Sequence, residues 1–175
     1  MIHLIYPSLN KVRIVDLGSG EGKFKKLLER KGAVVLGVDK EGGDIKHDLN
    51  EPLPFRDKEF DLVVSLAVLE HLEKPEVFLR EVKRIAHAGV LTTPHRRSKR
   101  LLEFLAHLGL INREHIKDHK RYWTQKELKG YGFNTFLFSA GFNILFWFDE
   151  RGCTVYDNSV YLSEFVPERT GSSTG

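Results

Sequence analysis

The chain has 175 residues, of which 41% are hydrophobic and 29% charged, and its 27 Lys and Arg against 24 Asp and Glu give a net charge of +3. This length and composition predict one globular domain with a substantial core and exclude a disordered chain. The longest apolar runs are too short to cross a bilayer, and no secretory signal opens the sequence, so we expect a cytoplasmic protein. The single cysteine, Cys153, excludes an internal disulfide and a cysteine-based zinc site.

The first half of the chain alternates β-rich apolar runs with segments of helical periodicity. The first run leads through a glycine-rich turn, residues 18–22, into a helix that we expect to stop at Gly32. A connection over 40–46 is too short for a crossover helix, and a second helix is predicted to begin at Pro75. The predicted strands are residues 12–17, 34–39, 60–66 and 90–94. This alternation is typical of an α/β fold with a mainly parallel sheet.

The second half contains fewer signals. Apolar residues at helical spacing predict a helix over 101–108, and the capping-box pattern at 124–127 predicts a last helix that ends near Gly141. Two final strands are predicted over 143–148 and 159–166, with a turn between them. We therefore expect a single domain over 1–169 and a flexible tail over 170–175.

The glycine-rich turn is the first candidate site. A strand that passes through glycines into a helix places backbone N–H groups and the positive end of the helix at one point, which receives an anionic or polar ligand. A plain tight turn is the alternative for this pattern taken alone. Asp39 ends the second predicted strand, where a carboxylate can accept hydrogen bonds from both hydroxyls of a ribose. Together these features predict a cofactor that contains a nucleoside.

Two residues favour S-adenosylmethionine over a dinucleotide. Lys23 stands where a dinucleotide fingerprint would place its last glycine. Asp16 precedes the first glycine by two positions, and a carboxylate there is unfavourable beside a pyrophosphate but useful beside the ammonium of an amino acid.

At these positions the sequence resembles the class I S-adenosylmethionine-dependent methyltransferases. The resemblance extends over about 12–94, with a weaker echo over 124–142. It rests on motifs at residues 15–22, 37–39, 47–55, 60–65 and 69–72. It implies a Rossmann-like, doubly wound sheet, mostly parallel with an antiparallel C-terminal strand, in three α/β/α layers. The sequence departs from the family pattern at 86–89, where the usual glycine-rich turn before the strand 90–94, the fifth strand of the family's sheet, is missing, and in the short connection over 40–46.

The resemblance implies a set of cofactor-binding residues within these motifs. They are Asp16, Gly18, Ser19, Gly20, Asp39, Lys40, Asp48, Leu49 and Ser65. In the family, the first motif holds the methionine end of the cofactor, the acid of the second holds the ribose, and Asp48 and Leu49 would contact adenine. Asp44 is a rival for the adenine contact, because residues 43–45 also resemble a strand-edge acid. We prefer Asp48, since the residues 53–55 that follow it fix the register.

Methyl transfer from a sulfonium requires alignment in a dry pocket, and a base only if the acceptor must lose a proton. His71, after the predicted strand 60–66, is the first candidate for a catalytic base, and Glu70 is the second. The alternative is that His71 only caps the loop or lines the pocket. We expect no metal site: His115 and His119 have the spacing of zinc ligands on a helix, but no accompanying ligand pattern supports them.

Residues 94–123 contain eight Lys and Arg against three acids, and four of the eight histidines. In this fold the segment after the fifth strand emerges beside the cofactor, so we interpret about 95–123 as a substrate lid; a solvated basic face is the alternative. The candidate substrate-binding residues are His95, Arg96, Arg97, Arg100, Tyr122 and Trp123. Tyr122 and Trp123 either line the acceptor pocket or anchor the lid on the core.

These inferences predict a methyltransferase that binds S-adenosyl-L-methionine, releases S-adenosyl-L-homocysteine and acts on a small anionic molecule. One alternative is a methyltransferase of RNA or protein, since Tyr122 and Trp123 beside Lys120 and Arg121 could stack on a base. Another is a cofactor-binding module without catalysis, and a nicotinamide enzyme is the least favoured. The sequence leaves the oligomeric state open, including a homodimer.

Overall fold

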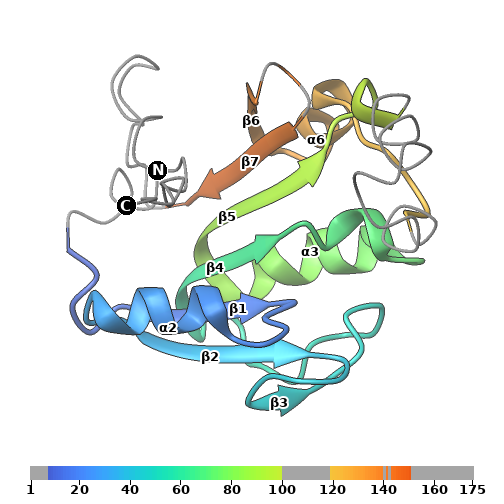
Figure 1. The fold of residues 1–175 in the computed structure, drawn as a ribbon. Coiled ribbons are helices and arrows are strands. Elements are labelled where there is room, and N and C mark those ends of the chain that lie inside the picture. Colours follow the sequence, from blue (N-terminus) through green and yellow to red (C-terminus); the bar gives the residue numbers. More distant parts are fainter. Residues whose placement is uncertain (1–7, 100–118, 140, 142, 151–175) are drawn as a thin grey trace, which may run out of the picture.

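A computed structural model describes residues 8–99, 119–139, 141 and 143–150. The strands are β1 (Arg13–Leu17), β2 (Val34–Asp39), β3 (Ile45–Lys46), β4 (Phe60–Leu66), β5 (Ala86–Pro94), β6 (Asn134–Phe138) and β7 (Asn143–Asp149). They form one sheet in the order β3-β2-β1-β4-β5-β7-β6 (Figure 1). The first five strands are parallel, and β7 is antiparallel to both of its neighbours. The predicted fold class is therefore confirmed.

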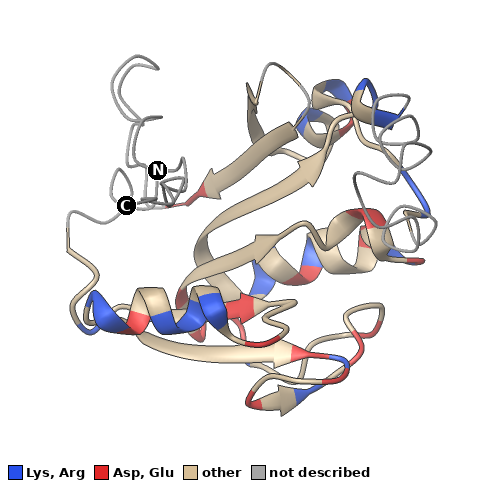
Figure 2. Ribbon diagram, in the orientation of Figure 1, with Lys and Arg blue, Asp and Glu red and all other residues tan. Residues whose placement is uncertain are grey.

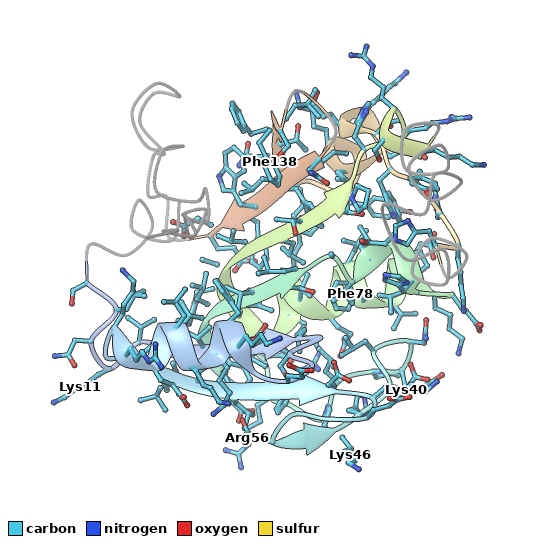
Figure 3. All side chains as sticks on the ribbon, in the orientation of Figure 1. Lys11, Lys40, Lys46, Arg56, Phe78 and Phe138 are labelled. Atoms are coloured by element: carbon cyan, nitrogen blue, oxygen red, sulfur yellow. The ribbon has the colours of Figure 1, made fainter. Side chains whose placement is uncertain are left out.

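Helices cover the two faces of this sheet. The described helices are α2 (Lys23–Arg30), α3 (Pro75–Ile85) and α6 (Gln125–Gly130), with a 3-10 turn η1 (Leu69–His71) after β4. Side chains alternate along a strand, so β1 directs Val15 into one core cluster and Ile14 into another. The first cluster includes Phe78 of α3, labelled in Figure 3, and Leu128 of α6, whereas the second includes Leu28 of α2.

Charged residues lie mainly on the helices and loops, and the strands are largely uncharged (Figure 2). This distribution is expected for strands that are covered on both faces. None of the helices in the described ranges is long and apolar enough to cross a membrane.

The predicted start of the fifth strand, at Val90, is wrong. α3 passes directly into β5, which begins at Ala86 and pairs with β4 from its first residue. No turn separates the helix from the strand, and Lys58 stabilises the junction. Its Nζ donates hydrogen bonds to the carbonyl oxygens of Lys83 (2.6 Å) and Ala86 (3.1 Å). These are carbonyl groups that a helix end would otherwise leave without partners.

Gly89 of β5 fits beneath the side chains of its neighbours. A Cβ at this position would lie 2.4 Å from Cε1 of Phe148 and 2.7 Å from Cγ1 of Val63. We expect Gly89→Ala to lower the free energy of unfolding by about 2 to 3 kcal/mol, the usual cost of overpacking a core. Chemical denaturation measures this change.

Gly130 provides the control for that substitution. A Cβ there would meet no atom within 4 Å, and the residue lies in α6. Gly130→Ala should therefore leave stability unchanged or raise it by up to about 1 kcal/mol, because alanine is the better helix former. Equal destabilisation by both substitutions would contradict the packing at Gly89.

The start of the last helix is confirmed and its predicted end is wrong. Thr124 and Glu127 form the predicted capping box, with the Thr124 N–H donating to Oε2 of Glu127 at 2.9 Å and the Glu127 N–H donating to Oγ1 of Thr124 at 3.3 Å. The helix stops at Gly130, and Gly132 follows with φ at +76°, a conformation that ends helices. The next residues form β6 instead of continuing the helix.

The predicted strand over 143–148 is confirmed as β7, but its partners are β5 and β6. The predicted strand over 159–166, the predicted helix over 101–108 and the predicted tail lie outside the described residues. The connection between β2 and β3 contains no helix, as expected from its length.

Candidate active site

The glycine-rich turn lies at the carboxyl end of β1. Gly18, Gly20 and Gly22 all have positive φ angles, of 82°, 49° and 72°. The N–H groups of Gly18 and Ser19 donate to the carbonyl oxygen of Val38 at 2.8 and 3.2 Å, which ties the turn to β2. Gly18 also packs against the segment after β4, because a Cβ there would lie 2.2 Å from Cγ2 of Val68. Only glycine fits this position without rearrangement.

Asp39 ends β2 beside this turn, as predicted. Its Oδ2 accepts a hydrogen bond from the Gly20 N–H at 2.9 Å, and its Oδ1 accepts one from the Glu41 N–H at 3.1 Å. Burial alone would raise the pKa of Asp39, but hydrogen bonds from backbone N–H groups outweigh it and hold the pKa below its ordinary value. The group is therefore a carboxylate, the form that accepts hydrogen bonds from ribose hydroxyls. Lys40, labelled in Figure 3, follows it and is exposed.

Asp16 is only 3% exposed, and its Oδ2 has no hydrogen-bond partner among the described residues. Burial, and to a smaller extent the charge of Asp39, raise the pKa of Asp16 to about 6, while Lys25 opposes both effects. A buried carboxyl group of this kind is stabilised by a cation that binds next to it. It can receive the ammonium group that the sequence assigned to this position.

The two carboxylates proposed for adenine differ in their contacts. Asp44 accepts a hydrogen bond from the Gly37 N–H at 2.7 Å and lies 3.5 Å from Nζ of Lys25, so it holds the loop after β2. Asp48 accepts hydrogen bonds from Asn50 at its backbone and side-chain nitrogens, both at 2.9 Å, and these lower its pKa. Leu49 beside it is 7% exposed. The choice of Asp48 stays a prediction.

Substitution of the two carboxylates separates these roles. We expect Asp48→Ala to weaken S-adenosylmethionine binding about tenfold with little loss of stability. We expect Asp44→Ala to lower the free energy of unfolding by about 1 to 3 kcal/mol, because the buried Gly37 N–H loses its acceptor. Calorimetry measures the first effect and thermal unfolding the second. The reverse pattern would make Asp44 the adenine contact.

The two serines predicted to bind the cofactor differ in their hydrogen bonds. The Ser65 hydroxyl is buried and donates to the carbonyl oxygen of Leu17 at 2.9 Å, which joins the ends of β4 and β1. The Ser19 Oγ is buried without a hydrogen-bond partner in the described part of the chain. Ser19 therefore has hydrogen-bonding capacity left for a ligand, while the hydroxyl proton of Ser65 is already used.

Glu70, His71 and His119 form a polar cluster, called here the histidine cluster. One ligand-type atom from each lies within 4.8 Å of the others, and the two imidazole centroids are 4.9 Å apart. Glu70 is fully buried; its Oε2 accepts a hydrogen bond from Thr93 at 3.0 Å, and its Oε1 has no partner among the described residues. Burial raises the pKa of Glu70 to about 7, with hydrogen bonds opposing it. The two predicted catalytic residues, Glu70 and His71, thus lie next to each other and next to His119.

His119 was missing from the predicted site. Backbone hydrogen bonds bring it there, because the N–H groups of Lys120 and Arg121 donate to the carbonyl oxygen of Glu70 at 2.8 and 3.3 Å. Its Nδ1 lies 3.2 Å from the hydroxyl of Tyr122, a predicted substrate residue. Local sequence contains no signal for this contact, since it joins segments far apart in the chain.

The histidine cluster adjoins the glycine-rich turn. Val68, which packs on Gly18, is the cap residue of η1, and η1 carries Glu70 and His71. On the other side, Oδ1 of Asn50 accepts hydrogen bonds from the N–H groups of Glu73 and Lys74 at 2.7 and 3.0 Å. The cluster therefore lies next to the residues predicted to hold the cofactor.

The two described ends of the predicted lid meet at the end of β5. His95 and Trp123 form a parallel bridge, and the Arg96 N–H donates to the carbonyl oxygen of Trp123 at 2.9 Å. Trp123 is fully buried and joins the core, with the Arg121 guanidinium 4.2 Å from its ring centroid. This position supports the anchoring role of Trp123.

The remaining predicted substrate residues differ in exposure. Arg96 and Arg97 are exposed and form no ion pair with any residue that the structure describes. His95 is 9% exposed; its Nδ1 accepts the Arg97 N–H at 3.1 Å, and burial together with the charge of Arg97 lowers its pKa. Arg100 and His115 lie outside the described residues.

Comparison with known proteins assigns this part of the chain to a family. Residues 15–92 match the family described as "Methyltransferase domain". This match contains the glycine-rich turn, Asp39, Asp48 and the segment of η1. Residues 15–92 form a class I S-adenosylmethionine-dependent methyltransferase domain. The cofactor of this family is S-adenosylmethionine, and the unpartnered buried carboxyl of Asp16 and the open turn at Gly20, where a Cβ would meet nothing within 4 Å, both fit it.

Relatives in sequence and in structure agree with this assignment. A ubiquinone biosynthesis O-methyltransferase of Maricaulis maris is 32% identical over 108 residues, which cover 50% of this chain and 42% of the relative. One of Roseobacter denitrificans is 27% identical over 124 residues, covering 60% and 48%. The chain thus spans less than half the length of these curated relatives.

Solved structures show the same fold. A chain from the complex between the Haloferax volcanii Trm112 methyltransferase activator and a methyltransferase has a TM-score of 0.61 and 17% identity, over 83% of this chain and 86% of that one. An S-adenosylmethionine-dependent methyltransferase of Mesorhizobium loti has a TM-score of 0.57 and 20% identity, over 83% and 94%.

Proposed function

We propose that this chain is an S-adenosylmethionine-dependent methyltransferase that methylates an oxygen atom of a small anionic acceptor. The observation that carries this proposal is the histidine cluster beside the glycine-rich turn. An oxygen acceptor must lose a proton to become a good nucleophile, and the cluster supplies polar groups for this at the correct edge of the sheet. The O-methyltransferases among the relatives support the same class of acceptor.

When bound, S-adenosylmethionine supplies an electrophilic methyl group on a sulfonium. The chain has to hold the acceptor oxygen in line with the carbon–sulfur bond and keep water out. Asp16 would bind the ammonium and Asp39 the ribose. His71 stays the predicted base, and Glu70 the second candidate.

The proposal of an anionic acceptor rests on Arg96 and Arg97. Both are exposed at the end of β5, and neither is engaged by an acidic residue in the described part of the chain. Two other basic residues of the predicted lid are already paired, Lys120 with Glu73 at 2.5 Å and Arg121 with Glu127 at 3.1 Å. These pairings reduce the charge available to RNA and favour a small molecule.

A transfer assay with methyl-labelled S-adenosylmethionine tests the proposal. The acceptors are phenols and catechols in pairs with and without a carboxylate, with transfer RNA and a protein extract as rival substrates. We expect labelled methyl ethers, formed faster from the acids, and loss of that preference in an Arg96→Ala/Arg97→Ala variant. Label in RNA or protein alone would replace the small acceptor, and cofactor binding without transfer to any pool would leave a binding module.

A further inference from the structure

We propose that the histidine cluster binds a divalent transition-metal cation such as Zn²⁺, Mn²⁺ or Co²⁺. This inference rests on the proposed oxygen acceptor, whose proton the cation would help to remove. Two imidazoles and one carboxylate are a donor set that such cations use with further positions open. Hard cations such as Mg²⁺ prefer oxygen ligands and fit this set less well.

The buried carboxylate is the second observation. Glu70 is fully buried, and no described Lys or Arg pairs with it, while its Oε1 lacks any hydrogen-bond partner among the described residues. A carboxylate in that position is costly unless a cation completes it. His71 and His119 are both partly exposed, so a cation can reach the cluster from solvent.

The surroundings orient two of the three ligands. The Thr93 hydroxyl donates to Oε2 of Glu70 at 3.0 Å, and the Tyr122 hydroxyl lies 3.2 Å from Nδ1 of His119. Such outer contacts fix the rotation of ligating side chains in metal sites. Ligand atoms around one tetrahedral cation lie about 3.4 Å apart, so the cluster, with atoms within 4.8 Å, needs shifts of about 1 Å to close.

A cation here would bind the acceptor oxygen and lower the pKa of the acceptor hydroxyl, as bound metals do for water. The transfer itself keeps its balance: the carbon–sulfur bond breaks with its electron pair going to sulfur, an oxygen–carbon bond forms, and the acceptor proton is released to solvent. His71 then holds the cation instead of taking the proton. The sequence predicted no metal because Glu70 and His71 lie far from His119 in the chain.

Direct titration tests the site without any assay of activity. The full chain, free of affinity tags and treated with a chelator, is titrated with Co²⁺ while the visible absorption is followed, and with Zn²⁺ by calorimetry. We expect one cation per chain. The variants His71→Ala, His119→Ala and Glu70→Gln should each weaken binding by at least about tenfold. His87→Ala, on β5 and outside the cluster, is the matched control and should bind normally.

Thermal unfolding shows whether each variant is folded, and only folded variants count. Stoichiometric binding that the His71→Ala/His119→Ala double variant retains, or no binding by the wild-type chain, would overturn the metal site. Methyl transfer that proceeds unchanged with chelator would overturn it too, while the proposed methyltransferase stands. A cation that binds at the cluster of a chain that methylates no oxygen acceptor would preserve the site and refute the acceptor.

Discussion

Replacement of Gly18 by alanine should weaken S-adenosylmethionine binding at least about 100-fold and lower the free energy of unfolding by about 2 to 4 kcal/mol. Two effects add at this position. The φ of +82° disfavours any residue with a Cβ, and that Cβ would lie 2.2 Å from Cγ2 of Val68. To avoid the overlap, either the turn or the start of η1 must move, and both adjoin the proposed cofactor site. Calorimetry and chemical denaturation measure the two changes.

A second substitution distinguishes the overlap from the backbone strain. Removal of Cγ2 in Gly18→Ala/Val68→Ala leaves the nearest atom of residue 68 at 3.5 Å, an ordinary contact. The double variant should therefore recover part of the binding, whereas Val68→Ala alone should have a small effect. Gly20→Ala is the strain control, because its φ is also positive but a Cβ would meet nothing within 4 Å. If the double variant binds the cofactor no better than Gly18→Ala, the overlap with Val68 is not the reason that position 18 requires glycine.

Asp16→Asn should remove a pH dependence from both stability and cofactor binding. The pKa of about 6 in the folded chain lies above the ordinary value of 3.8. The folded state therefore holds this proton more tightly, and wild-type stability falls as the pH rises from about 4 to about 6, then stays level. At pH 7 the variant should be more stable by up to about 3 kcal/mol, and below about pH 4 the two should converge.

Cofactor binding should respond in the opposite sense. The ammonium group of S-adenosylmethionine favours ionised Asp16, so wild-type affinity should rise with pH up to about 6, by as much as about tenfold per unit. The variant should bind more weakly at pH 7 and show little change over the same range. Calorimetry at several pH values checks this. Asp57→Asn neutralises an exposed carboxylate and should shift neither curve by much; a wild-type affinity that is flat with pH would place the ammonium elsewhere.

Much of the fold could be predicted because its strands are continuous apolar runs that end at distinctive turns. The strand over 34–39 is such an apolar run, and Asp39 marks its end. The turn after residue 17 is marked by its glycines. The start of β5 had none, because Lys58 closes the end of α3 from a distant loop. Residues 134–138 joined the sheet by pairing with β7 in a hairpin, and this pairing replaced the helix that was expected to continue to Gly141.

In the candidate site, too, residues within local motifs could be predicted, and residues placed by long-range contacts could not. Asp16 and Asp39 follow from motifs whose residues are adjacent in sequence. His119 could not be placed, because a backbone hydrogen bond from Lys120 to Glu70 sets its position, and the sequence instead suggested a pairing with His115. Trp123 had two alternative roles, and only its complete burial favours the core.

The hydrogen bonds at Asp39 have one more consequence. The same carboxylate that would receive the ribose already holds the Gly20 and Glu41 N–H groups in place. The turn is therefore preorganised, and the cofactor meets a surface that does not have to be ordered at the moment of binding, which avoids an entropic penalty. Substitution of Asp39 would therefore have two effects at once: it would loosen the turn, and it would remove a contact to the ligand.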